Sequence, residues 1–506
     1  MDPATEQLRP LIVSGLAWKG ISQVATQVTR LGVAVLLARI LAPHDYGLAG
    51  MVLVFTSFVL VLSDLALGSR LVQRRVLSDA DTSTAFWTSV GAGVVFTGLG
   101  IGLAGPIASL LGEPRLRPMI AVLSITFLLS GISLTQSALL VRSMSFRALE
   151  LREMAGTAAG AAIGILIAFL GFGAWAIIAQ QLTVSIVATV LVWLYSSWRP
   201  KWTYSLASLR DFAGFSGNML GASFVLQLRA TSDNFLIGRF VGASALGVYA
   251  LAYNVVLVPF NRVAIPLSQV LFPAMSQIQD DLERMKTYWV RSLRLIAAIA
   301  MPALLGLIVA APDFTEVILG HSWQRAVPVI RLLAVVAIFQ TLQFLNATIL
   351  QAVDRTDLLL KWTAFSYIAA LGAFVTGLQW GVVGVAAAFA IVSVVIEPLY
   401  ARLTAATIGL SFRELIRGIA GVAQAAAGMG AVSFVTHAVV ANAGVGAGIR
   451  LVAEIGAGGI TFAVLCRIRA PEVAEELRGL RRRNRAAADS AEAPVGGLVK
   501  NPASGA

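Results

Sequence analysis

The chain has 506 residues, of which 58% are hydrophobic and only 13% are charged, and its mean hydropathy is +0.81. Soluble domains are roughly half apolar, so this composition predicts that a bilayer surrounds most of the chain. The net charge of +12 is scattered between hydrophobic segments, which argues against a nucleic-acid partner. The single cysteine, Cys466, excludes an internal disulfide and a cysteine-based metal cage.

Apolar segments of about twenty residues or more recur along the chain, and this length crosses about 30 Å of hydrocarbon. The first ten residues lack the features of a cleaved signal peptide, so we expect the first segment to be retained. Charged, glycine and proline breaks divide the apolar runs into about fourteen predicted transmembrane helices. Their residues are 12–38, 46–67, 85–111, 118–141, 152–170, 174–197, 212–238, 245–272, 288–311, 326–351, 360–378, 382–406, 415–440 and 446–466.

The loop charges predict an orientation for these helices. Alternate loops carry eighteen Lys and Arg residues, against seven in the intervening loops, and cytoplasmic loops are expected to hold the excess. Both termini are therefore predicted to be cytoplasmic. Residues 469–506 are rich in arginine and then in Ala, Ser, Gly and Pro, which predicts a basic, disordered tail.

The sequence also contains an internal repeat. LLARILAPHDYGLAG (36–50) aligns with LIGRFVGASALGVYA (236–250), which matches Arg39 to Arg239 and Gly47 to Gly247. Weaker matches follow in the same order while the offset drifts from 200 to about 208. Six predicted helices separate equivalent positions, so the two copies have the same orientation in the membrane.

The repeat predicts an all-α membrane protein with two parallel six-helix lobes around a central cavity. We assign residues 1–200 to the N-lobe, 201–410 to the C-lobe and 411–468 to two additional helices. In transporters built from such repeats the substrate binds at the seam between the lobes, which rock against each other.

Polar residues follow one face of the first predicted helix at steps of four, four and three, namely Lys19, Gln23, Gln27 and Arg30. Lipid would strongly disfavour such a stripe, so we expect it to line the cavity. For Lys19 the alternative is that its chain snorkels to the cytoplasmic interface.

The seventh predicted helix carries a matching stripe. Ser223 and Gln227 stand 200 residues after Gln23 and Gln27, and Arg229 and Asp233 follow on the same helix. Their i, i+4 spacing also allows an internal ion pair between Arg229 and Asp233 as an alternative.

Three further ionisable residues lie at or near membrane depth. Arg262 stands in the eighth predicted helix between two prolines, which permit a bend, and either lines the cavity or lies near the cytoplasm. Asp64 and Glu397, like Asp233, are candidates for ion coupling, although both stand near predicted cytoplasmic helix ends and an interfacial role is favoured. The candidate cavity residues sum to a positive charge, which suits an anionic substrate.

The sequence lacks a G-x-x-x-x-G-K-[ST] phosphate loop and therefore a nucleotide motor of its own. His44, His321 and His437 are far apart and show no metal-ligand spacing. We therefore predict no metal and no cofactor, and nothing in the sequence supports an enzyme.

Residues 36–74 and 246–281 resemble the signature regions of bacterial polysaccharide transporters. This family belongs to the multidrug/oligosaccharidyl-lipid/polysaccharide superfamily, and the resemblance covers roughly residues 10–440. It implies a flippase that moves an undecaprenyl-diphosphate-linked oligosaccharide from the cytoplasmic to the outer leaflet of a bacterial inner membrane. It also implies a cation-lined cavity, which Arg30 and Arg229 would supply.

Two other functions stay open at this point. A cation-coupled multidrug exporter of the same superfamily would depend on buried acids and usually has twelve spans. A membrane-bound glycan polymerase or ligase fits a six-helix duplication less well than two rocking lobes do. The expected partners are the lipid-linked substrate, membrane lipids and other polysaccharide-assembly proteins, with no nucleic acid.

Overall fold

The computed structural model describes residues 22–23, 25–64, 67–74 and 76–476, with side chains left undescribed at 58, 60–64, 211–222, 258–270 and 274. Within these residues the chain is helical and contains no strand. Nine of the described helical stretches are long and apolar enough to cross a membrane. The protein is therefore an all-α, multi-pass membrane protein, as the composition predicts.

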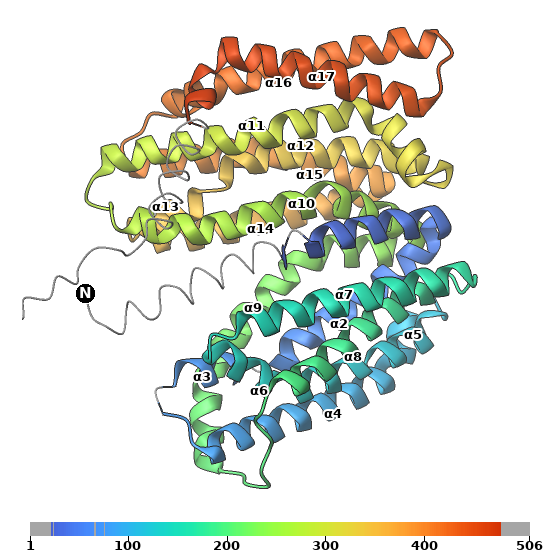
Figure 1. Cartoon of the computed structure of the whole chain (residues 1–506), viewed down its shortest axis with the longest axis vertical. Coiled ribbons are helices and arrows are strands. Elements are labelled where there is room, and N and C mark those ends of the chain that lie inside the picture. The colour runs from blue at the N-terminus through green and yellow to red at the C-terminus, as the bar shows by residue number, and fades with distance from the viewer. Residues whose placement is uncertain (1–21, 24, 65–66, 75, 477–506) are drawn as a thin grey trace, which may run out of the picture.

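The first half of the chain forms one bundle (Figure 1). It starts with a helix at residues 25–40, called here the N-terminal helix. The following helices are α2 (Pro43–Asp64), α3 (Leu67–Gln73), α4 (Asp79–Leu111), α5 (Leu116–Leu123), α6 (Ile125–Arg142), α7 (Phe146–Phe169) and α8 (Trp175–Tyr195).

The second half forms a second bundle beside the first, although α9 (Leu206–Phe240) runs from it along the first bundle and packs there on α2 and α4 (Figure 1). Its elements are α9, α10 (Ala243–Ser276), α11 (Leu282–Phe314), the π-helix η1 (Thr315–Leu319), the 3-10 helix η2 (His321–Ala326), α12 (Val327–Gln343), α13 (Asn346–Ala352), α14 (Thr356–Gly377), the 3-10 helix η3 (Leu378–Trp380) and α15 (Gly381–Thr407).

Local sequence signals set several helix starts. Ser78 caps α4, and its hydroxyl accepts from the Asp81 backbone N–H while the Asp81 carboxylate accepts from the Ser78 N–H. Ser411 and Glu414 form the same reciprocal pair at the start of α16 (Phe412–Asn442). These bonds satisfy backbone donors that a helix N-terminus leaves without partners.

Helix boundaries confirm the internal repeat. The N-terminal helix ends at residue 40 and α9 at Phe240, while α2 begins at Pro43 and α10 at Ala243. Further along, α4 begins at Asp79 and α11 at Leu282, and α8 and α15 end the two copies. The offset grows slowly from 200, as the sequence comparison predicts.

The two bundles meet where α2 crosses α10. Gly47 and Gly247 are the fifth residues of these helices. A Cβ on Gly47 would overlap the carbonyl oxygen of Ala243, and one on Gly247 would overlap that of Pro43. Glycine at both repeat-related positions therefore lets the two backbones touch.

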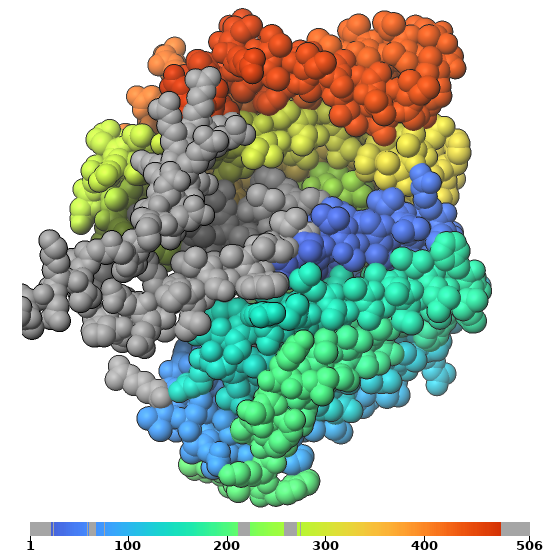
Figure 2. All heavy atoms as spheres, viewed as in Figure 1, coloured from blue at the N-terminus to red at the C-terminus, as the bar shows by residue number. Residues whose placement is uncertain are grey.

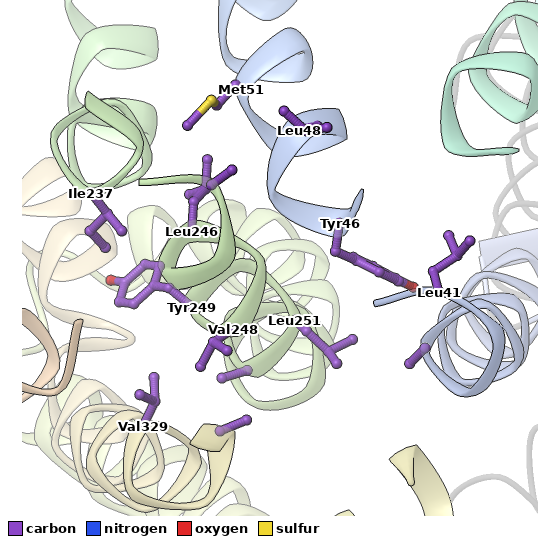
Figure 3. Close-up of a cluster of buried hydrophobic side chains, with 14 of the residues drawn as sticks. Leu41, Tyr46, Leu48, Met51, Ile237, Leu246, Val248, Tyr249, Leu251 and Val329 are labelled. Carbon is purple, nitrogen blue, oxygen red and sulfur yellow. The ribbon is translucent and has the colours of Figure 1, made fainter. Parts of the chain in front are cut away.

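Apolar side chains surround this crossing and form the largest described core. Leu48 and Met51 from α2 lie beside Leu246 and Val248 from α10, with Ile237 of α9 close by (Figure 3). All of these side chains are at most 4% exposed. Burying such residues contributes about 1.5–3 kcal/mol each, so the crossing fixes the bundles against each other at this end.

The last two helices, α16 and α17 (Ala447–Arg469), lie outside the repeat. They pack as a hairpin against α11 and cover one edge of the molecule, away from the N-terminal bundle (Figures 1 and 2). Leu415, Ile419 and Val422 of α16 are buried in a core shared with Trp289 and Leu293 of α11.

Candidate functional site

Arg30 lies on the N-terminal helix. It stands ten residues before the helix end at residue 40, which is about 15 Å at 1.5 Å per residue and about half of the hydrocarbon thickness. Gln27 precedes it on the same helix, and both Gln27 and Gln23 are partly buried. Lys19 lies outside the described residues.

Arg30 forms an ion pair with a residue that the sequence reading did not select. Its Nη2 lies 2.5 Å from Oε1 of Glu153, and both side chains are 39% exposed. Glu153 stands two turns inside α7, which begins at Phe146, whereas the sequence places the start of this span at residue 152. Glu153 is the second residue of the predicted span, and the earlier start of α7 places it well inside the helix, beside the cation.

Gln227 and Arg229 lie on α9 at a similar depth. Arg229 stands eleven residues before the end of α9, or about 16 Å. The Gln227 amide donates to the Ser57 hydroxyl of α2 at 2.9 Å, which joins the two bundles near the middle of the helices. The Arg229 side chain is exposed.

An exposed arginine at this depth requires a polar environment. Charged side chains inside spans almost always face the bundle interior or a water-filled space, since hydrocarbon excludes them. Arg229 lies within electrostatic range of the Glu397 carboxyl and of the Tyr253 and Tyr400 hydroxyls. Glu397 is half-buried and stands ten residues before the end of α15, so these groups together form a polar region inside the C-terminal bundle.

Asp233 does not pair with Arg229, although their spacing would allow it. The Asp233 carboxylate is buried and accepts hydrogen bonds from the Tyr249 hydroxyl at 2.9 Å and from the Asn234 backbone N–H at 2.8 Å. The alternative of an internal ion pair on α9 is therefore not formed. The side chains of Asp64 and Arg262 lie outside the described part of the chain.

Contacts between the bundles gather at the end where the N-terminal helix stops. Arg39 donates to the carbonyl of Ile318 at 2.9 Å and also to that of Val317, both in η1. The Trp323 indole donates to the Ala38 carbonyl at 2.6 Å. Carbonyl groups in the last turn of a helix lack partners within it, and Arg39 satisfies two of them in η1.

A second polar cluster lies on α11, α16 and α17, far from Arg229 in the sequence. It contains Asp313, His437, Arg450 and Glu454. In the sequence Arg450 stands thirteen positions from His437, and the two acids stand at least seventeen positions away. No local pattern therefore indicates a partner for His437. The fold brings the four residues together.

These features define a class. The protein is a multi-pass membrane protein with two repeated helical bundles and cationic or amide side chains at mid-depth on one helix of each. A family model described as polysaccharide biosynthesis protein matches residues 36–328, more than half of the chain. The chain belongs to this polysaccharide biosynthesis protein family.

Curated relatives extend the match over most of the chain. It is 29% identical over 413 residues to the lipopolysaccharide biosynthesis protein WzxC of Escherichia coli strain K12, covering 81% of this chain and 84% of the relative. It is 26% identical over 457 residues to the teichuronic acid biosynthesis protein TuaB of Bacillus subtilis strain 168, covering 90% and 95%.

A solved structure shares the fold. The lipid II flippase MurJ in an inward closed conformation superposes with a TM-score of 0.72 at 14% sequence identity, covering 91% of this chain and 100% of that one. At this level of identity the likeness concerns the fold, which is that of a polytopic membrane transporter.

Proposed function

We propose that the protein is a flippase for a lipid-linked oligosaccharide with an undecaprenyl-diphosphate-type anchor. It moves the glycan head group from the cytoplasmic to the outer leaflet of the inner membrane, for cell-surface polysaccharide synthesis. Family membership and the relatives' polysaccharide roles support this substrate class. The observation that carries the mechanism is the exposed Arg229 halfway along a membrane-spanning helix.

In this mechanism residues 1–200 and 201–410 act as two lobes that alternate in exposing the site. The excess of Lys and Arg in alternate loops favours cytoplasmic termini. In that orientation the C-terminal ends of the N-terminal helix and of α9 lie on the outer side. The contacts of Arg39 and Trp323 then close the outer side in this structure. Opening that side requires these bonds to break.

The substrate's own charge can drive the reaction. Outward movement of an anion across a membrane whose inside is negative is favourable by about 2.3 kcal/mol per charge per 100 mV, so two charges gain roughly 4.6 kcal/mol. Ion coupling is then optional. If an ion is coupled, the buried Asp233, held by Tyr249, is the best-placed described acid.

The proposed binding residues are Arg229, Gln227, Arg30, Gln27 and Gln23. Arginine forks match phosphate oxygens, and amides can bind phosphate or sugar hydroxyls. In this view Glu153 competes with the substrate for Arg30.

The Arg30–Glu153 pair gives a test of this competition. Exposed ion pairs contribute only about 0.2–1 kcal/mol, so neither Arg30→Gln nor Glu153→Gln should unfold the protein. We expect Arg30→Gln to lower the transport rate at least about ten-fold, which corresponds to a loss of about 1.4 kcal/mol of substrate binding. Glu153→Gln should transport at the wild-type rate. Transport by purified variants in proteoliposomes measures both. Equal losses in the two variants would show that the pair is structural.

Depletion of the protein in its host tests the proposed function itself. We expect lipid-linked oligosaccharide to accumulate on the inner leaflet and surface polymer to fall, with both restored by the wild-type gene. A membrane-impermeant glycosidase applied to right-side-out and inside-out vesicles reports the leaflet. Accumulation on the outer leaflet would point instead to a polymerase or ligase, and unchanged polymer would refute the proposal.

A further inference from the structure

The polar cluster on the last two helices has no role in the proposed substrate site. Asp313 stands near the end of α11, just before η1, while His437 lies near the end of α16. Arg450 and Glu454 lie in the first two turns of α17. All four residues are within about two helical turns of the same end of the molecule.

The geometry of the cluster centres on the His437 imidazole. Its Nδ1 lies 2.6 Å from Oε1 of Glu454 and 3.0 Å from Oδ2 of Asp313. The side chains of Asp313 and Glu454 are each 1% exposed, and that of His437 is 28% exposed. Two buried carboxylates, one from α11 and one from α17, thus converge on a ring nitrogen of a histidine on α16.

Arg450 holds one side of the cluster. Its Nε and Nη2 lie 3.0 and 2.5 Å from Oδ1 of Asp313. With a neutral imidazole and both carboxyl groups ionised, the two acids and this guanidinium together carry one net negative charge, and both carboxyl side chains are 1% exposed. An uncompensated charge of this kind is costly away from water, and a bound cation would balance it.

Hydrogen bonds within the cluster leave two oxygens unsatisfied. Oδ2 of Asp313 and Oε2 of Glu454 are buried without a hydrogen-bond partner among the described residues. A protonated Nδ1 can direct its hydrogen to only one carboxylate at a time, so protonation of His437 would not satisfy both. A metal ion accepts several lone pairs at once.

We propose that His437, Asp313 and Glu454 bind a divalent cation of the zinc type. Their ligand atoms lie within 4.8 Å of one another. In a tetrahedral zinc site each ligand atom is about 2.0 Å from the metal, so any two ligand atoms are about 3.3 Å apart. To reach that spacing, the three ligand atoms would have to shift relative to one another by a few tenths of an ångström to about 1.5 Å. Imidazole and carboxylate are both zinc ligands.

Arg450 has a second role in this site. Groups that hydrogen-bond a metal ligand orient it, and Arg450 fixes Asp313 through Oδ1 while Oδ2 stays free for the metal. A cavity of about 320 Å³ borders the cluster at Glu454, and its other lining residues are mostly apolar, among them Phe314 and Leu451. An outer partner that orients a ligand, as Arg450 does, is expected of a metal site.

The site gives the two additional helices a function in assembly. Each ligand comes from a different helix, so the metal ties the α16–α17 hairpin to α11 of the C-terminal bundle. A ligand that binds only the folded state stabilises it, by about 2.7 kcal/mol at a hundred-fold excess over its dissociation constant. Zinc should therefore raise the thermal stability of the full-length protein.

The test uses the full-length protein in detergent, stripped with a chelator and titrated with zinc chloride. We expect about one tightly bound zinc ion per chain by mass spectrometry of the dialysed protein, with a higher melting temperature. Cobalt(II) in place of zinc should give the visible absorption of a tetrahedral site. His437→Ala and Glu454→Gln should each weaken binding at least about 100-fold, more than the loss of an outer partner costs.

His321→Ala is the matched control. The His321 side chain is 83% exposed, and its Nε2 lies 3.6 Å from Oε1 of Glu316, so this variant should bind zinc as the wild type does. Absence of stoichiometric zinc in the wild-type protein would refute the site and leave the cluster as an ion-pair network. Equal binding by His437→Ala, or a cobalt spectrum without tetrahedral bands, would equally refute it. The zinc content and the cobalt spectrum of the wild-type protein test the site even if a variant fails to fold.

Discussion

Replacing Arg229 by glutamine is expected to abolish transport of the lipid-linked oligosaccharide while the protein accumulates normally. Arg229 is exposed at mid-depth on α9 and has no ion pair among the described residues. Removing one partner of a desolvated charge pair costs about 2–5 kcal/mol, or roughly thirty-fold and more in rate at low substrate. Stability should change little, since the side chain is not part of the buried core.

Two further variants sharpen this prediction. Arg229→Lys keeps the charge but not the planar fork, so it should retain partial activity. Arg239→Gln is the matched control, because Arg239 is an exposed arginine near the end of the same helix, packed over Phe240. Initial rates in proteoliposomes and surface polymer in cells are the measurements. Wild-type polymer from Arg229→Gln at normal protein level would contradict its place in the site.

Hydropathy and repeat patterns predicted the helices because these signals are local. A helix that crosses a bilayer must be apolar over a set length, and each predicted span from 46–67 onward coincides with one helix or with two consecutive ones. The equivalence of Gly47 and Gly247 was likewise readable from an alignment of the two halves. Their direct contact with the opposite bundle was not, since it depends on how α2 crosses α10.

The side-chain pairings were beyond the sequence because they join distant segments. Arg30 and Glu153 stand 123 residues apart, and Arg450 and Asp313 stand 137 apart. Apolarity also marks where hydrocarbon begins rather than where a helix begins, so the predicted span 152–170 starts six residues after α7 does at Phe146. Glu153 was therefore the second residue of the predicted span, although it stands two turns inside the helix.

Gly47 is the position where the smallest possible change should have the largest effect on the transport cycle. We expect Gly47→Ala to reduce transport at least about ten-fold, although alanine favours a helix by about 1 kcal/mol over glycine. The new methyl group would overlap the backbone carbonyl of Ala243, which cannot rotate away as a side chain could. The bundles would have to separate at this end, where Arg39 and Trp323 also join them.

Distance measurements can separate this effect from misfolding. In a Cys466→Ser background, spin labels at the exposed positions 115 and 325 report the separation of the two bundles at this end. Gly47→Ala should shift the distance distribution to longer values, and Gly247→Ala should do the same through Pro43. Gly102→Ala on α4 is the control, since a Cβ there meets nothing within 4 Å. An unchanged distribution together with full transport would mean that the crossing adapts by sliding, and that backbone contact at these glycines is not needed to close the outer side.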